Sequence, residues 1–63
     1  MKLSIFIQNS RRGIQQRLAR YVGVKPVNVS RWKKGMSKPK LEHCKLIEEF
    51  TEGKVTYKDF IKE

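Results

Sequence analysis

The sequence predicts a single all-α domain of five short helices that spans residues 1–63. Glycines and prolines divide the chain into helix-sized segments, and apolar residues recur within these segments at intervals of three or four. The alternation of apolar and polar residues that indicates a strand is confined to residues 54–57. A chain of 63 residues with 38% hydrophobic content builds one small core, which leaves little room for a deep catalytic cavity.

The first two predicted helices cover residues 2–8 and about 13–22. The first is rich in apolar side chains, namely Leu3, Ile5, Phe6 and Ile7. The second carries an apolar stripe at positions i, i+4, i+7 and i+8, formed by Ile14, Leu18, Tyr21 and Val22. Gly23 marks the junction with the next helix.

The third predicted helix covers residues 26–34 and begins with Pro26, whose missing N–H costs nothing at the first helical position. Pro39 is expected to open a fourth helix in the same way. This helix runs to about Thr51, and Gly53 ends it.

A last short turn is predicted over residues 57–61, because Thr56 and Asp59 have the spacing of a capping box. This segment holds more apolar residues than a terminal turn needs, namely Val55, Tyr57, Phe60 and Ile61. They either pack onto the small core or form a contact between two copies of the chain.

The net charge of +9 is distributed unevenly along the chain. Residues 1–41 hold eleven Lys or Arg and no acid, whereas residues 42–63 hold four Lys and all six acids. Such self-repulsion destabilises a compact chain unless a polyanion relieves it. The expected partner is therefore a phosphate backbone or an anionic membrane.

Other classes of site find little support in the sequence. Cys44 is the single cysteine, so neither an intramolecular disulfide nor a cysteine zinc site is expected. His43 is the single histidine and falls within the apolar arc of its helix. We therefore expect no enzyme activity, no metal and no cofactor. No apolar run is long enough to span a bilayer, and residues 3–7 are too short for a signal peptide, so a bacterial cytoplasmic location is expected.

The third helix has two different faces on a helical wheel. Val29 and Trp32 fall on one side, whereas Val27, Arg31 and Lys34 fall on the other. One face therefore belongs to the core, and the opposite face can enter the major groove of DNA, where each base pair shows a distinct pattern.

The side chains of this helix suit particular parts of DNA. Arg31 can bond guanine O6 and N7 together, and Val27 suits a thymine methyl group. Asn28 suits an adenine edge and Ser30 a base or a phosphate, although a solvated helix face explains these two equally well. Phosphate contacts are expected from the basic residues that follow, Lys33, Lys34, Lys38 and Lys40.

Residues at fixed positions in this region resemble the helix-turn-helix of the phage Cro and repressor superfamily: Gln15, Ala19, Gly23, Val24, Val29 and Trp32. Together with the tail CKLIEEFTEGKVTYKDF, the chain is most similar to the YdaS-like, all-helical Cro group. The resemblance covers about residues 12–61, with the motif at about 13–34.

The resemblance implies roles for individual residues. It implies a phosphate contact from Gln15 and a backbone contact from Lys34. A backbone contact is also expected from the basic Arg17. The resemblance also implies a groove-facing set made of Pro26, Val27, Ser30 and Arg31. Lys25 stands where such proteins commonly carry a capping Ser or Thr, so it is expected either to contact a phosphate or to mark an irregular helix start.

The predicted function is sequence-specific binding of double-stranded DNA by a transcriptional regulator, most simply a phage or prophage repressor of Cro type. One helix reads too few base pairs, so we expect a homodimer on a pseudo-palindromic operator with half-sites about 34 Å apart. The alternative is an antitoxin with the same fold, which would also bind a toxin. RNA binding is disfavoured because the aromatic residues are not arranged as stacking platforms. A peripheral membrane peptide built on residues 3–7 is disfavoured because the apolar residues elsewhere have core spacing and glycines between the segments.

Overall fold

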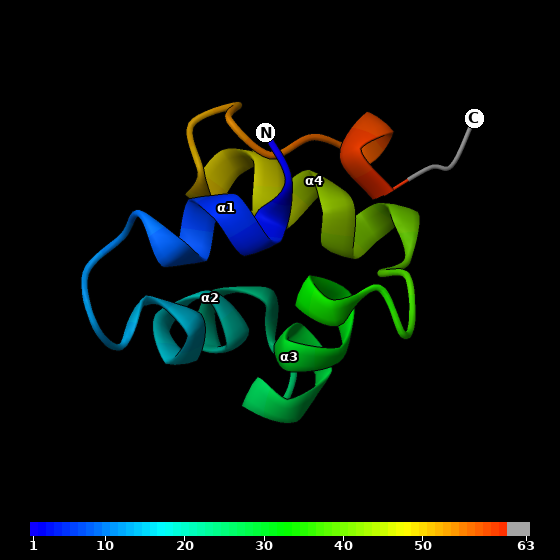
Figure 1. The fold of residues 1–63 in the computed structure, drawn as a ribbon. Helices are drawn as coiled ribbons and strands as arrows, with labels where there is room; N and C mark the ends of the chain where they lie inside the picture. Colours follow the sequence, from blue (N-terminus) through cyan, green and yellow to red (C-terminus); the bar gives the residue numbers. More distant parts are fainter. Residues whose placement is uncertain (61–63) are drawn as a thin grey trace.

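The computed structural model describes residues 1–60, and this whole part of the chain is free of strands (Figure 1). Its elements are α1 (Leu3–Gln8), α2 (Ile14–Val22), α3 (Pro26–Lys34), α4 (Leu41–Phe50) and the 3-10 turn η1 (Tyr57–Phe60). The all-α class is therefore confirmed. The count of five helices is wrong, because the last element within residues 1–60 is a single 3-10 turn.

The helices form two layers around one core. In Figure 1, α1 and α4 lie above α2 and α3, and the N-terminal end of α3 projects at the bottom of the molecule. The interior is filled by the fully buried side chains of Leu18, Val29, Ile47 and Val55. Each comes from a different segment, so the core exists only when all of them are assembled.

The helix α3 has the bounds that the sequence predicts. Pro26 occupies its first turn, and Lys25 precedes it in an extended conformation without a side-chain capping bond. The helix start is therefore regular, and the unusual Lys25 does not distort it. At the other end, Gly35 adopts a left-handed conformation with φ +77°.

Three helices end with the same hydrogen-bond pattern. A backbone N–H just after the helix donates to the carbonyl oxygen of the residue five positions earlier. The bonds are Val24 to Ala19 at 2.9 Å, Met36 to Arg31 at 2.9 Å and Gly53 to Glu48 at 2.8 Å. This pattern needs a left-handed residue just before the donor, which is Gly23 in α2, Gly35 in α3 and Glu52 in α4. The prediction that Gly53 itself ends α4 is only partly met: Glu52 takes the position before the donor with φ 56°, and Gly53, also left-handed with φ 82°, supplies the donor N–H.

The start of α4 also differs from the prediction. Pro39 does not open the helix, because Lys40 follows it in an extended conformation and α4 begins at Leu41. Pro39 is instead buried, and its carbonyl oxygen accepts a hydrogen bond from the Cys44 thiol at 3.7 Å.

The segment after α4 packs against the core. Val55 is fully buried and Phe60 packs onto the core cluster, whereas Tyr57 is exposed. Ile61 lies outside the described residues. The capping pair is confirmed, since the Thr56 N–H donates to the Asp59 carboxylate at 2.8 Å. Val55 and Phe60 thus have a structural role.

Candidate nucleic-acid interface

The two faces of α3 are placed as the helical wheel predicts. Val29 and Trp32 are buried, whereas Val27, Arg31 and Lys34 are exposed. Val27 keeps 51% of its surface accessible, so its methyl groups are available for contact. Because the N-terminal end of α3 projects from the molecule in Figure 1, this face is free to enter a groove.

The other predicted base-contacting residues border this face. Pro26 is exposed at the start of α3, and Asn28 and Ser30 are partly buried on its two flanks. All five residues predicted to contact bases thus belong to α3, and the exposed part of the set is Pro26, Val27 and Arg31.

A polar link joins the start of α2 to α3. The side-chain amide of Gln15 donates to the carbonyl oxygen of Pro26 at 3.3 Å and accepts from the Lys33 ammonium at 3.4 Å. The sequence predicts only phosphate contacts for Gln15 and Lys33. The structure shows that they also hold the first turn of α3 against α2, a contact that no local pattern reveals.

Arg17 is separated from the remaining predicted phosphate contacts. It lies with Arg20, Tyr21 and Phe50 around a shallow hollow of about 370 Å³ between α2 and α4. Gln15 contacts α3, on the other flank of α2. The structure therefore groups Arg17 with α4 and not with the exposed face of α3.

Lysines line the larger hollow of about 570 Å³, which lies between the start of α1 and the end of α3. They are Lys2, Lys33, Lys34 and Lys38, and Asp59, which is paired with the N-terminal amine, lines the same hollow. We call this hollow the lysine groove. The sequence does not indicate a role for Lys2, because only the fold brings it beside residues more than thirty positions away. Lys25 and Lys40 are exposed outside the groove.

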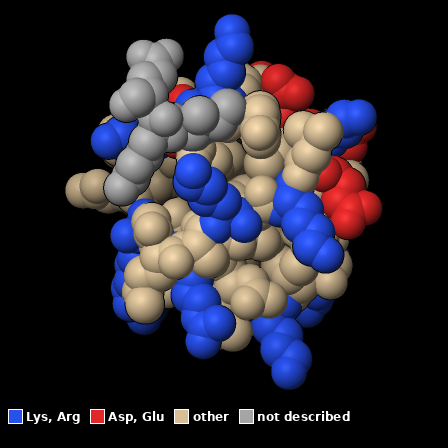
Figure 2. Space-filling model, turned by 90° about the vertical axis from the view of Figure 1, so that its right-hand side faces the viewer, with Lys and Arg blue, Asp and Glu red and all other residues tan. Residues whose placement is uncertain are grey.

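The basic side chains are not neutralised within the described part of the chain. The single ion pair found among residues 1–60 joins the N-terminal amine to Asp59 at 3.2 Å, and no Lys or Arg takes part in it. Figure 2, which looks at the right-hand side of Figure 1, shows Lys and Arg over this whole face, including its lower part, and acids mainly at the upper right edge. The surface around α3 is therefore strongly positive.

The residues considered for other chemistry are placed in or beside the core. The Cys44 thiol is buried, and burial raises its pKa. His43 packs against Trp32 with ring centroids 5.8 Å apart. Within residues 1–60, no group of three His, Cys, Asp or Glu side chains could hold a metal ion. The helices of the same part of the chain are all too short and too polar to cross a membrane.

The fold and this surface define a small all-helical protein of helix-turn-helix type. A model of the family described as "Bacterial toxin YdaS" matches residues 6–62, and the chain belongs to this family. The expected similarity to the YdaS-like group is thereby confirmed, whereas membership of the wider Cro superfamily stays a prediction. No curated protein and no solved structure matches the chain. The family is compatible with a small DNA-binding regulator and with a component of a toxin–antitoxin pair.

Proposed function

We propose that the protein is a sequence-specific regulator that binds double-stranded DNA with α3 in the major groove. The observation that carries this proposal is the exposed face of α3. There Val27, Arg31 and Lys34 are exposed, and neither Arg31 nor Lys34 forms an ion pair within residues 1–60. A helix of this kind fits the major groove, whose base pairs each present a distinct pattern.

Each residue of the face has a role that suits its chemistry. Arg31 bonds the two acceptors of a guanine, and Val27 contacts a thymine methyl group. Lys34 binds a phosphate, which positions the protein without reading sequence. The lysine groove continues the positive surface from the end of α3 to Lys2, so the DNA strand that leaves the major groove runs along it.

The partner that this proposal implies is an operator with approximate two-fold symmetry. Two copies of the chain would occupy half-sites about 34 Å apart, with one α3 in each. Such a protein acts as a repressor of phage or prophage type in the bacterial cytoplasm. The proposal needs neither a cofactor nor a catalytic step.

The second candidate function is that of one component of a toxin–antitoxin pair. The description of the family, which names a bacterial toxin, is the observation that favours it. Inducing the chain alone in bacterial cells separates the toxin of such a pair from a DNA-reading regulator. Growth arrest by both the natural chain and Arg31→Ala would indicate a toxic activity that does not depend on DNA reading.

Binding to three polyanions tests the proposal against its rivals. We expect tight binding to duplex DNA, weaker binding to an RNA duplex of the same sequence, and a steep loss of DNA affinity as salt rises. Circular dichroism should show full helicity without any ligand. Equal affinity for RNA, or helicity gained only with anionic vesicles, would contradict the proposal.

A further inference from the structure

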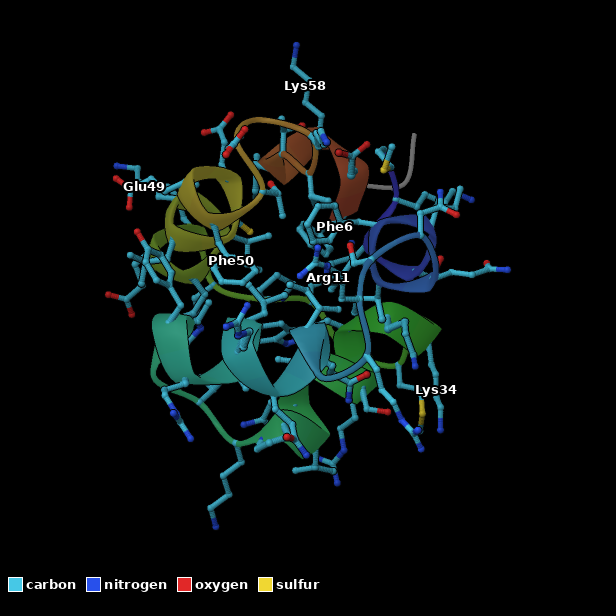
Figure 3. The ribbon with its side chains drawn as sticks, turned by 90° about the vertical axis from the view of Figure 1, so that its left-hand side faces the viewer. Phe6, Arg11, Lys34, Glu49, Phe50 and Lys58 are labelled. Atoms are coloured by element: carbon cyan, nitrogen blue, oxygen red, sulfur yellow. The ribbon has the colours of Figure 1, made fainter. Side chains whose placement is uncertain are left out.

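A second surface of the molecule is composed of residues that the proposed DNA interface leaves unused. It is defined by Arg17, Arg20 and Tyr21 of α2 and by Glu49 and Phe50 of α4, and we call it the α2–α4 face. Four of these residues line the hollow of about 370 Å³. Figure 3 looks at this side of the molecule and shows Phe50 between α4 and α2, with Glu49 at the outer edge.

The centre of this face is aromatic and accessible. Tyr21 keeps 49% of its surface exposed although it belongs to the apolar stripe of α2. Its ring lies against that of Phe50 with centroids 5.4 Å apart and planes tilted by 52°. Tyrosine and arginine are the residues that most often dominate the energetics of protein contacts, so this composition is typical of an interface.

The charges on the face have opposite signs at opposite edges. Arg17 and Arg20 lie on the α2 side. Glu49 lies on the α4 side, where it accepts a hydrogen bond from the Tyr21 hydroxyl at 3.1 Å. Neither arginine pairs with an acid within residues 1–60. A two-fold axis through the aromatic centre would place the arginines of one copy opposite the glutamate of the other, which is the self-complementarity that a symmetric dimer needs.

The position of the face leaves α3 free. Phe50 and Glu49 mark the α2–α4 face on the upper left part of Figure 3, whereas α3 lies below in Figures 1 and 3. The last segment, which the sequence suggested for this role, is used by the core through Val55 and Phe60.

We propose that the α2–α4 face joins two copies of this chain across a two-fold axis when they bind DNA. The inference rests on the proposed function, since DNA brings the copies together. Two chains of net charge +9 repel each other in solution, and a DNA backbone neutralises much of that repulsion. The dimer is therefore stable on DNA and weak without it.

A charge swap in trans tests this interface. In Arg20→Glu, two glutamates face each other at each edge of the dimer, and in Glu49→Arg two arginines do so. We expect each variant alone to lose about tenfold in cooperativity on a duplex with two half-sites. An equimolar mixture restores opposite charges at both edges, so cooperativity returns to near the natural level.

Two controls have the same change in charge at places outside the face. Lys58→Glu matches Arg20→Glu and lies on η1, at the top of Figure 3. Glu48→Arg matches Glu49→Arg and is exposed on the flank of α4 that faces away from α2. Glu49→Gln removes the charge with little change in shape. Thermal unfolding of every variant checks that the fold is retained.

Sedimentation measurements on three duplexes make the outcomes distinguishable. One duplex has a single half-site taken from a selection, one has two half-sites, and one has a random sequence of the same length. Cooperative binding that the mixture restores supports the interface. Two outcomes overturn the interface, provided that binding to the single half-site stays intact. In the first, the natural chain shows no cooperativity on any duplex. In the second, both variants lose cooperativity and the mixture does not restore it. No preference for the half-site over random DNA would instead refute the proposed function, and the random duplex would still test the face.

Discussion

Thr51 is a polar residue that the core of residues 1–60 buries almost completely, with 2% of its surface accessible. Its hydroxyl donates to the carbonyl oxygen of Ile47 at 2.8 Å and accepts from the Val55 N–H at 3.1 Å. One side chain thus closes the end of α4 and holds the segment that places Val55 in the core.

Replacing Thr51 by Val keeps the shape and removes the hydroxyl. The Val55 N–H would then lose its partner, and we expect the free energy of unfolding to fall by about 1–3 kcal/mol. Denaturant unfolding checks this, with Thr51→Ser as the control that keeps the hydroxyl. A Val variant as stable as the natural chain would refute the role given to this hydrogen bond.

Substitutions of Arg31 and Lys34 distinguish recognition of the DNA sequence from sequence-independent binding to the DNA backbone. Arg31→Ala should cost about 1–3 kcal/mol of binding free energy on the operator and relax the preference at one base pair. Lys34→Ala should weaken all sequences to a similar degree and lower the salt slope by about one. Titration of specific and random duplexes at several salt concentrations measures both effects. Equal weakening of both duplexes by Arg31→Ala would place this residue on the backbone instead.

The sequence predicts whether a side chain faces the core or solvent where helical periodicity alone determines it. Val29 and Trp32 face the core and Val27 and Arg31 face solvent because a 3.6-residue period separates them. Tyr21 follows the same period and is nevertheless exposed, because it lies at the margin of the stripe, where its hydroxyl reaches Glu49. This contact depends on how the helices pack, which periodicity does not describe.

At the scale of elements, the end of α4 contains a strained backbone conformation at Glu52, which a substitution can relieve. Glu52 adopts the left-handed conformation that Gly23 and Gly35 adopt at the ends of α2 and α3. A residue with a Cβ pays about 1–2 kcal/mol for this conformation, partly offset by the lower entropy that it loses on folding.

Glu52→Gly should therefore raise the free energy of unfolding by about 0.5–1 kcal/mol. The matched control is Gly23→Ala, where an added Cβ meets no atom within 4 Å, so its cost is conformational alone. We expect that variant to lose about 1 kcal/mol. Denaturant unfolding compares the two, and a destabilised Glu52→Gly would contradict the account of this helix end.

The start of η1 predicts a dependence of stability on pH. Burial raises the pKa of Asp59, but hydrogen bonds from Thr56 and from the N-terminal amine, together with the charge of the amine, outweigh it and leave the pKa lowered. Because the folded pKa lies below the unfolded one, this contribution is complete above the ordinary pKa of Asp and is lost as pH falls.

Thermal unfolding from about pH 5 downward should therefore show a decrease in stability that Asp59→Asn reduces. Glu42→Gln is the control, since its carboxylate is exposed and forms no ion pair within residues 1–60. An identical pH profile for the natural chain and Asp59→Asn would remove Asp59 from this explanation.

The sequence predicts the ends of a helix where a single residue restricts or frees its own backbone conformation. Pro26 and Gly35 delimit α3 because one residue fixes φ and the other tolerates the left-handed conformation. The same logic failed at Pro39, which lies two residues before α4, and held only in part at Gly53, which follows Glu52 in the turn. Proline and glycine also suit loops, so their presence alone does not set the first or last helical residue.

For the whole molecule, the sequence predicted the separation of charge but not its shape. The excess of Lys and Arg in residues 1–41 is evident from the chain itself. That Lys2 meets Lys34 and Lys38 in one groove, and that Arg17 lies apart beside Phe50, depends on packing between distant segments. Contacts of this kind have no local signal, which explains why the outward face of α3 was predicted and the groove was not.

Selection of bound duplexes from a random pool tests most directly whether α3 reads DNA sequence. The account predicts a two-fold symmetric consensus for the natural chain, with half-sites about 34 Å apart. A parallel selection with Arg31→Ala should lose the preference at one base pair in each half-site and keep the rest. No enrichment for the natural chain, or an unchanged consensus for the variant, would contradict it.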